Sequence, residues 1–271
     1  MPDTALFFTP DATIIKPYAL MDLDDTLFQT MRKIDAWDIP TTAADDLVCA
    51  SVNRDGEPLS FMSARQAAFF NWLLHSTDLI VVTARDTDEI QRVRLPFSSW
   101  QVLTHGAVIM TPDRQMLPTW AAQMHQTLIA LQHKIRAIQA HLQHAQPTLR
   151  VRLHSDRFCD EHLVIYISIK HPDKDHDALK TLAQTLPQQI DNFAQDFYVH
   201  VNANNLAILP HAVHKKHAVQ FLLDQHLEPR RPSFGFGDSL ADVPFLQCLD
   251  WYGTPSRGQL HEHLHTSLTD E

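Results

Sequence analysis

The chain has 271 residues, of which 44% are hydrophobic and 20% are charged, a composition that permits one large core or two modest domains. A formal net charge of -10 without any long basic block argues against nucleic acid as a partner, and no apolar run approaches the roughly 20 residues that a membrane-spanning helix requires. Three separated cysteines exclude a disulfide framework and a zinc-knuckle spacing, and they favour a reduced, cytoplasmic protein.

The first strong signal along the chain is an apolar run followed by acids. Residues 1–16 are expected to form an irregular lead-in or a short edge strand, without a signal-peptide pattern. Residues 18–21 are typical of a parallel strand buried on both faces. Asp22, Asp24 and Asp25 follow directly, at the end of the strand where open α/β sheets bind ligands. Acids this close repel one another, so the sequence predicts that a cation binds among them.

The segments up to residue 114 continue the pattern of an α/β sheet. Strands at 47–52 and 59–62, joined by an Asn-Arg-Asp-Gly turn, are predicted to form a hairpin that overhangs the acids. Ser63 can cap the helix that follows. The next predicted elements are a strand at 78–85, a helix from 86 or 87 to 93, a strand at 100–104 and a short hairpin at 107–114.

Composition changes at Pro118, where a long helix rich in Gln, His and Ala begins. It is predicted to extend to residue 146, because its apolar positions keep a helical period. Strands at 148–154 and 162–170, a helix at 175–186 and strands at 197–201 and 206–209 are expected to follow. The order helix–strand–strand–helix–strand–strand indicates a separate α+β unit. A helix at 216–227, a strand at 233–237, a helix that contains Pro244 and a strand at 249–253 complete the prediction.

The predicted fold is therefore α/β. A Rossmann-like parallel sheet core at residues 1–112 and 206–271 is interrupted by an inserted α+β domain at residues 113–205. Because the insert leaves and re-enters the core at the carboxyl edge of the sheet, it is expected to lie over the acids as a cap would.

Polar side chains from four strand or helix ends are expected to meet at this edge, since the carboxyl ends of parallel strands converge. They are Asp22 and Asp24, Thr83 and Arg85, Lys215 or Lys216, and Asp238 and Asp242. Carboxylate oxygens suit Mg²⁺, and a carboxylate can also attack phosphorus. A lysine can offset charge on the transferred oxygens, and a second carboxyl can move a proton. The set predicts magnesium-assisted phosphoryl transfer.

Four segments resemble, in order, the motifs of the haloacid dehalogenase superfamily. Asp22-Leu-Asp-Asp-Thr26 is similar to its Asp-x-Asp-x-Thr motif, and Thr83 is similar to its second motif. Lys215, with Lys216 as the reserve, resembles the lysine of its third motif, and Gly237-Asp-Ser-Leu-Ala-Asp242 resembles Gly-Asp-x-x-x-Asp. The position and order of the insert resemble the C2 cap of Cof-like and sucrose-phosphate phosphatase relatives. Three departures are His105, Ala84 and Ala241, where such relatives commonly have Asn, Gly and Asn.

This resemblance implies a magnesium-dependent phosphomonoesterase for a small phosphorylated metabolite, such as a sugar phosphate. It implies that Asp22 is the nucleophile and Asp24 the general acid/base. Thr83, Arg85 and Lys215 would hold the phosphoryl group. The metal would be held by Asp22, the backbone carbonyl of Asp24 and Asp238, with Asp242 orienting metal-bound waters or Lys215.

Other interpretations stay open at this point. The same core could serve a phosphomutase or phosphotransferase, and a non-catalytic scaffold that binds phosphorylated ligands is an alternative of another class. Arg85 could form a surface ion pair, and Asp242 could cap a helix. The 18 histidines are expected mainly at the surface. Four polar residues of the insert are expected on a solvated strand face, with contact to the substrate as the alternative: Arg152, His154, His200 and Asn202.

Overall fold

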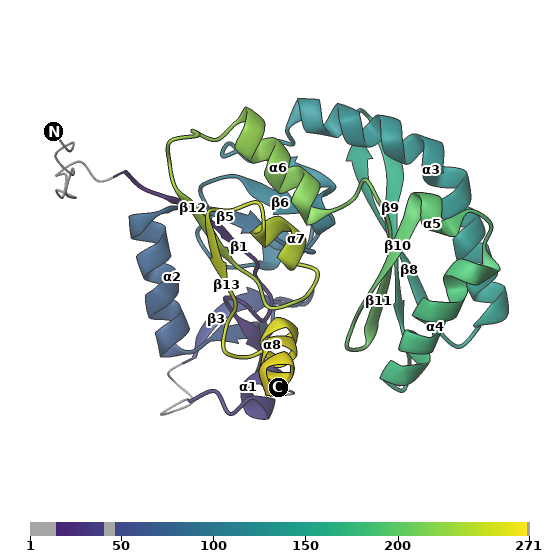
Figure 1. Cartoon of the computed structure of the whole chain (residues 1–271), viewed down its shortest axis with the longest axis horizontal. Coiled ribbons are helices and arrows are strands. Elements are labelled where there is room, and N and C mark those ends of the chain that lie inside the picture. Colours follow the sequence, from purple (N-terminus) through teal and green to yellow (C-terminus); the bar gives the residue numbers. More distant parts are fainter. Residues whose placement is uncertain (1–14, 41–46, 270–271) are drawn as a thin grey trace, which may run out of the picture.

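Strand β1 (Tyr18–Met21) lies inside a six-stranded sheet of the computed structural model, which describes residues 15–40 and 47–269 (Figure 1). The strand order is β13-β12-β1-β5-β6-β7. The strands parallel to β1 are β5 (Asp78–Val82), β6 (Gln101–Leu103), β12 (Ser233–Phe236) and β13 (Trp251–Gly253), and β7 (Val108–Met110) is antiparallel at one edge. This arrangement confirms the predicted α/β core. The predicted lead-in lies outside the described residues except for its last two positions.

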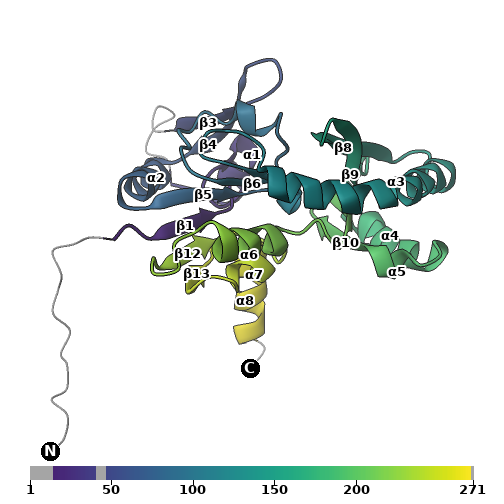
Figure 2. The same ribbon diagram turned by 90° about the horizontal axis from the view of Figure 1, so that it is seen from above.

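Helices cover both faces of this sheet (Figure 2). Helix α2 (Ala64–Ser76) packs on one face, where Phe69 and Trp72 contact the rings of Phe236 and Phe234. It begins as predicted at Ser63, whose side chain and that of Gln66 bond each other's backbone N–H in a capping box. Helices α6 (Lys215–Gln225), α7 (Val243–Leu246) and α8 (Gln259–Thr269) lie on the opposite side.

A three-stranded sheet lies beside the acidic strand end. The predicted hairpin is confirmed as β3 (Val48–Val52) and β4 (Pro58–Met62). A third strand, β2 (Gln29–Thr30), pairs with β4 and was not indicated by the sequence. It leads into α1 (Met31–Ala36). The predicted helix at 86–93 is wrong. Only a single 3-10 turn forms at Ile90–Arg92, because the chain then leaves the helical path to pair with β3: Val93 bridges Ser51, and the Arg94 N–H donates to the Ala50 carbonyl at 2.7 Å.

The insert forms a four-stranded antiparallel sheet of order β10-β11-β9-β8. Its elements are α3 (Pro118–Ala145), β8 (Arg150–Phe158), β9 (Glu161–Lys170), α4 (His176–Gln189), α5 (Phe193–Asp196), β10 (Phe197–Asn202) and β11 (Asn205–Pro210). We call this unit the cap. Because β11 is hydrogen-bonded within the cap sheet, we propose that the return to the core follows Pro210, whereas the sequence placed it at residue 206.

The two faces of the cap sheet differ in character. Helices α4 and α5 and the C-terminal part of α3 lie on the side of this sheet away from the core (Figure 1). The N-terminal end of α3 packs on the core, where Trp120 contacts Phe221 of α6. Apolar side chains such as Ile167, Ile169 and Ile208 pack with the helices into a core of their own. Side chains alternate between faces along a strand, so the intervening polar residues face the six-stranded sheet. None of the helices in the described ranges is both long and apolar enough to cross a membrane.

Candidate active site

Asp22 stands directly after β1, where the flanking strands β5 and β12 fix its backbone. Its N–H donates to the carbonyl of Phe236 at 3.0 Å, which continues the ladder one residue beyond the strand. Asp22 is only 5% exposed, and Thr26 Oγ1 donates to its Oδ2 at 3.2 Å. The carboxylate is therefore held in one orientation at the carboxyl edge of the sheet.

Lys215 opens helix α6 and reaches this carboxylate. Its Nζ donates to Asp22 Oδ1 and to Asp242 Oδ1, both at 2.7 Å. Burial alone would lower the pKa of Lys215, but the two carboxylates raise it above its ordinary value, so the ammonium group stays charged. Lys216, the alternative from sequence, is exposed. The structure thus brings Lys215, and not its neighbour, to Asp22.

Asp238 and Asp242 complete an acidic group after β12. Asp242 Oδ2 accepts hydrogen bonds from the Ser239 N–H at 3.0 Å and from Ser239 Oγ at 2.8 Å. Carboxylate oxygens of Asp22, Asp238 and Asp242 all lie within 4.8 Å of one another, and all three residues are buried. Asp22 and Asp238, which are 216 positions apart in the sequence, therefore meet at one place.

These carboxylates fit a divalent cation. Burial, with the charges of Asp242 and Asp24, raises the pKa of Asp22 to about 7 although Lys215 opposes it. Burial and the charge of Asp22 raise the pKa of Asp238 to about 9. A cation would favour the charged forms of such crowded acids, and a set of hard oxygen donors is what Mg²⁺ prefers. In the part of the chain that the structure describes, no other such group of potential ligands occurs.

Asp24 and Thr83 lie in the same cleft. Asp24 is paired with Arg85, for which the sequence left an ion pair and a substrate contact as alternatives. Arg85 donates from Nε and from one terminal nitrogen to the two oxygens of Asp24, each at 2.7 Å. The Asp24 side chain is nevertheless 49% exposed. Thr83 follows β5, is buried, and accepts from the Arg85 N–H at 3.2 Å. A direct contact of Arg85 with substrate remains a prediction.

A cleft of about 700 Å³ lies between this edge and the cap, and both contribute to its wall. Four cap residues line this cleft and do not form the solvated strand face that the sequence favours: Arg152, His154, His200 and Asn202. Tyr166 stacks on His154 and meets His105 of the core edge-on. The sequence could show that these strands alternate, but only the position of the cap shows what their polar face meets.

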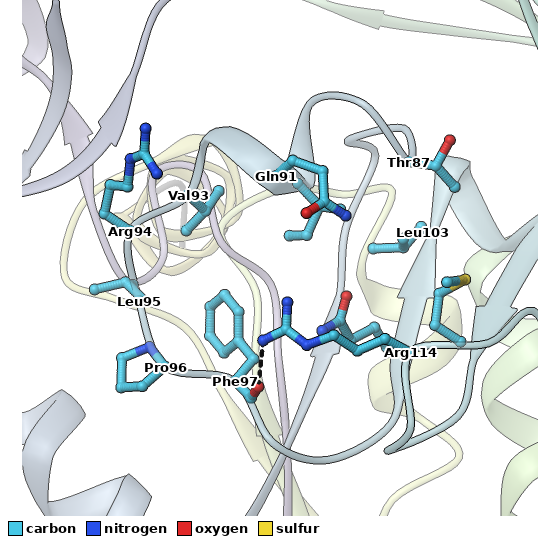
Figure 3. Close-up of a pocket in the computed structure, with 12 residues that line it drawn as sticks. Thr87, Gln91, Val93, Arg94, Leu95, Pro96, Phe97, Leu103 and Arg114 are labelled. Carbon is cyan, nitrogen blue, oxygen red and sulfur yellow. Dashed lines mark hydrogen bonds between the residues drawn. The ribbon is translucent and has the colours of Figure 1, made fainter. Parts of the chain in front are cut away.

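A second cavity, of about 400 Å³, lies under the loop that follows β5 (Figure 3). Apolar side chains, including Val93, Leu103 and Phe97, form much of its wall, and Arg114 donates to the Phe97 carbonyl at 3.2 Å. No carboxylate lines it. The chemistry expected from the sequence therefore belongs to the larger cleft.

Gly106 permits the close approach that places Lys215. Its φ is 97°, and an added Cβ would lie 2.4 Å from the His214 carbonyl oxygen and 2.9 Å from the Lys215 nitrogen. We expect Gly106→Ala to lower the free energy of unfolding by about 1–3 kcal/mol and to slow catalysis, because the start of α6 must move. Denaturant unfolding measures the first effect.

Gly56→Ala is the matched control for this prediction. Gly56 also has a positive φ, of 84°, but nothing lies within 4 Å of an added Cβ. It therefore shares the conformational strain and lacks the collision. Equal losses of stability in the two variants would contradict the proposed role of close packing at Gly106.

One family of known proteins matches this chain. The model of the family described as haloacid dehalogenase-like hydrolase matches residues 76–251, which is more than half of the chain. The search of curated proteins found no match. The matched range begins after Asp22, so the placement of the first motif in the site rests on the structure.

Two solved structures have a similar fold. Sucrose-phosphatase from Synechocystis sp. PCC6803, solved with sucrose and phosphate, is 13% identical; the match covers 94% of this chain and 97% of that one, with a TM-score of 0.55. The C-terminal domain of trehalose-6-phosphate phosphatase from C. albicans is 15% identical, with 86% and 72% covered and a TM-score of 0.55. At these identities the similarity establishes the fold.

Proposed function

This chain belongs to the haloacid dehalogenase-like hydrolases, and on that premise we propose that it is a magnesium-dependent phosphomonoesterase acting on a small phosphorylated metabolite, such as a sugar phosphate. The observation that carries the proposal is the contact of Lys215 with both Asp22 and Asp242, beside Asp238. The family match supports hydrolysis, and the named phosphatases of similar fold support a phosphate ester as the substrate.

In the proposed reaction, one carboxylate attacks and another moves protons. An Asp22 oxygen attacks the phosphorus, the bond from phosphorus to the ester oxygen breaks, and Asp24 gives that oxygen a proton. Asp24 then takes a proton from water, which attacks the aspartyl phosphate and releases inorganic phosphate and free Asp22. In the structure Arg85 donates to both Asp24 oxygens. This contact must open before Asp24 can carry the proton that it gives to the ester oxygen, and Arg85 is then free to contact the phosphoryl group.

Other residues of the site balance charge. Lys215 and Thr83 would contact the phosphoryl oxygens, since both are buried beside Asp22. Asp22 and Asp238, with the backbone carbonyl of Asp24, would hold Mg²⁺. Asp242 would orient Lys215, which it already contacts. When bound, the metal offsets negative charge on the phosphoryl group.

Hydrolysis is favoured over phosphotransfer by the openness of the cleft. The Asp24 side chain is 49% exposed, so water can reach the group proposed to activate it. A phosphomutase or phosphotransferase would need this position closed to water. Release of inorganic phosphate without an added acceptor would argue against transfer as the main activity.

The direct test uses p-nitrophenyl phosphate as a generic ester. We expect release of p-nitrophenol when Mg²⁺ is present and a loss of at least about 100-fold when EDTA removes it, because the crowded carboxylates then face the phosphate without a cation. Restoring Mg²⁺ should restore the rate. A rate that is the same with and without the metal would refute magnesium dependence, and a non-catalytic scaffold would release no phosphate from any ester.

A further inference from the structure

The inner face of the cap sheet presents its polar side chains in rows across the strands. Because neighbouring strands are in register, His154 lies opposite Tyr166, Arg152 opposite Ser168, and Arg150 opposite Lys170. The first row meets the core through His105. All six side chains line the cleft. The cleft therefore has an inner end at the aromatic row and an outer end at the row of Arg150 and Lys170.

The outer row concentrates positive charge. Arg150 and Lys170 are directly opposed on antiparallel strands, a placement of like charges that costs stability. Arg32 of α1 lines the same cleft from the core side. Within the described residues, none of these three side chains forms an ion pair, unlike Lys33 with Asp25 or Arg85 with Asp24. In a chain of net charge -10, this unpaired cluster indicates an anionic ligand.

Amide side chains and a further lysine extend the cluster. Asn202 and Asn205, at the paired ends of β10 and β11, also line the cleft. The cleft continues into a hollow of about 440 Å³ that shares Arg32 and Lys170 and adds Lys174. Lysine and arginine supply charge for an anion, and the asparagine amides supply N–H donors.

The spacing of the rows limits the size of the ligand. His154 and Arg150 are four residues apart on one strand, as are Tyr166 and Lys170, so the inner and outer rows are about 13 Å apart. A single small phosphate ester held at Asp22 would leave the outer row unused. A group that reaches this row must be carried on an elongated molecule.

We propose that the outer row binds a second anionic group of the substrate, a carboxylate or a phosphate at the end of an elongated ester whose other end lies at Asp22. This inference rests on the proposed phosphomonoesterase function and narrows its substrate class. Arg150 and Lys170 are the specificity-determining residues, and Arg32 adds positive charge at the same end of the cleft. Neutral disaccharide phosphates of the same length are poorer ligands.

The test uses three esters that share one disaccharide: trehalose 6-phosphate with a neutral, a carboxylate or a phosphate group at its 6′ position. We expect kcat/KM to be about 10-fold or more higher for at least one charged ester than for the neutral one. In the double variant Arg150→Gln/Lys170→Gln this preference should disappear. Its midpoint of thermal unfolding should stay the same or rise, since two directly opposed like charges are removed.

Arg136→Gln/Lys180→Gln is the matched control, because these exposed residues lie on cap helices α3 and α4 and the charge change is equal. We expect it to keep the preference. A wild-type enzyme that hydrolyses all three esters alike, or a preference that survives in Arg150→Gln/Lys170→Gln, would overturn the inference.

Binding separates this inference from the proposed function. Phosphonate analogues of the three esters, in which CH₂ replaces the ester oxygen, are titrated calorimetrically with Mg²⁺ present. Tighter binding of a charged analogue that is lost only in Arg150→Gln/Lys170→Gln supports the inference, whether or not the esters are hydrolysed. Failure to hydrolyse any ester would refute the phosphatase proposal and leave the binding inference standing. Equal binding of all three analogues overturns the inference whatever the activity.

Discussion

Asp22→Asn should reduce the rate of phosphate ester hydrolysis by at least about 10⁴-fold, because an amide cannot take the place of the attacking carboxylate oxygen. The side chains are nearly equal in size, and the asparagine carbonyl can still accept the hydrogen bond from Lys215. The protein should therefore remain folded. Single-turnover assays with p-nitrophenyl phosphate and Mg²⁺ measure the rate, and circular dichroism checks the fold.

Asp78→Asn serves as the control for this substitution. Asp78 begins β5 at the opposite end of the sheet from the cleft, where it pairs with Arg231. It should leave the rate within about twofold, since its side chain is partly exposed and exposed ion pairs contribute little. An Asp22→Asn enzyme that retains a tenth of the wild-type rate would exclude the aspartyl-phosphate mechanism.

Much of the core could be predicted because its signals are local. The apolar run before Asp22 and the glycines and acids after β12 each mark a buried parallel strand that ends in polar residues. Convergence of strand ends then predicted that Asp22, Thr83 and Asp238 would meet. The choice between Lys215 and Lys216 needed the structure, because it depends on the direction in which each side chain leaves the first turn of α6.

Features that depend on the relation between distant segments could not be predicted. The ion pair of Arg85 with Asp24 joins two loops that share no sequence signal. The polar face of the cap sheet had the alternation of an ordinary solvated face, and only the packing of the cap over the core makes it a wall of the cleft. The helix predicted at 86–93 also failed for a non-local reason, since Val93 and Arg94 pair with β3.

Lys215→Met should have the largest effect on stability of any single change at the site. Lys215 is 7% exposed and lies between Asp22 and Asp242, at 2.7 Å from each. Methionine has a similar length but no charge, so two buried carboxylates would lose their compensating cation. Removing one partner of a buried ion pair costs about 3–5 kcal/mol, because the other charge is left uncompensated. Thermal and denaturant unfolding of the metal-free protein measure this loss.

The same substitution should lower the rate of hydrolysis by about 10²–10³-fold, because the proposed contact with the phosphoryl oxygens is lost. Lys216→Met is the matched control: it removes the same charge one residue later on α6, from an exposed position. It should change stability by less than about 0.5 kcal/mol. Similar effects of the two substitutions on both stability and rate would show that Lys215 is an ordinary helix residue. Loss of stability alone would assign it a structural role between the carboxylates and leave the phosphoryl contact to Thr83 and the metal.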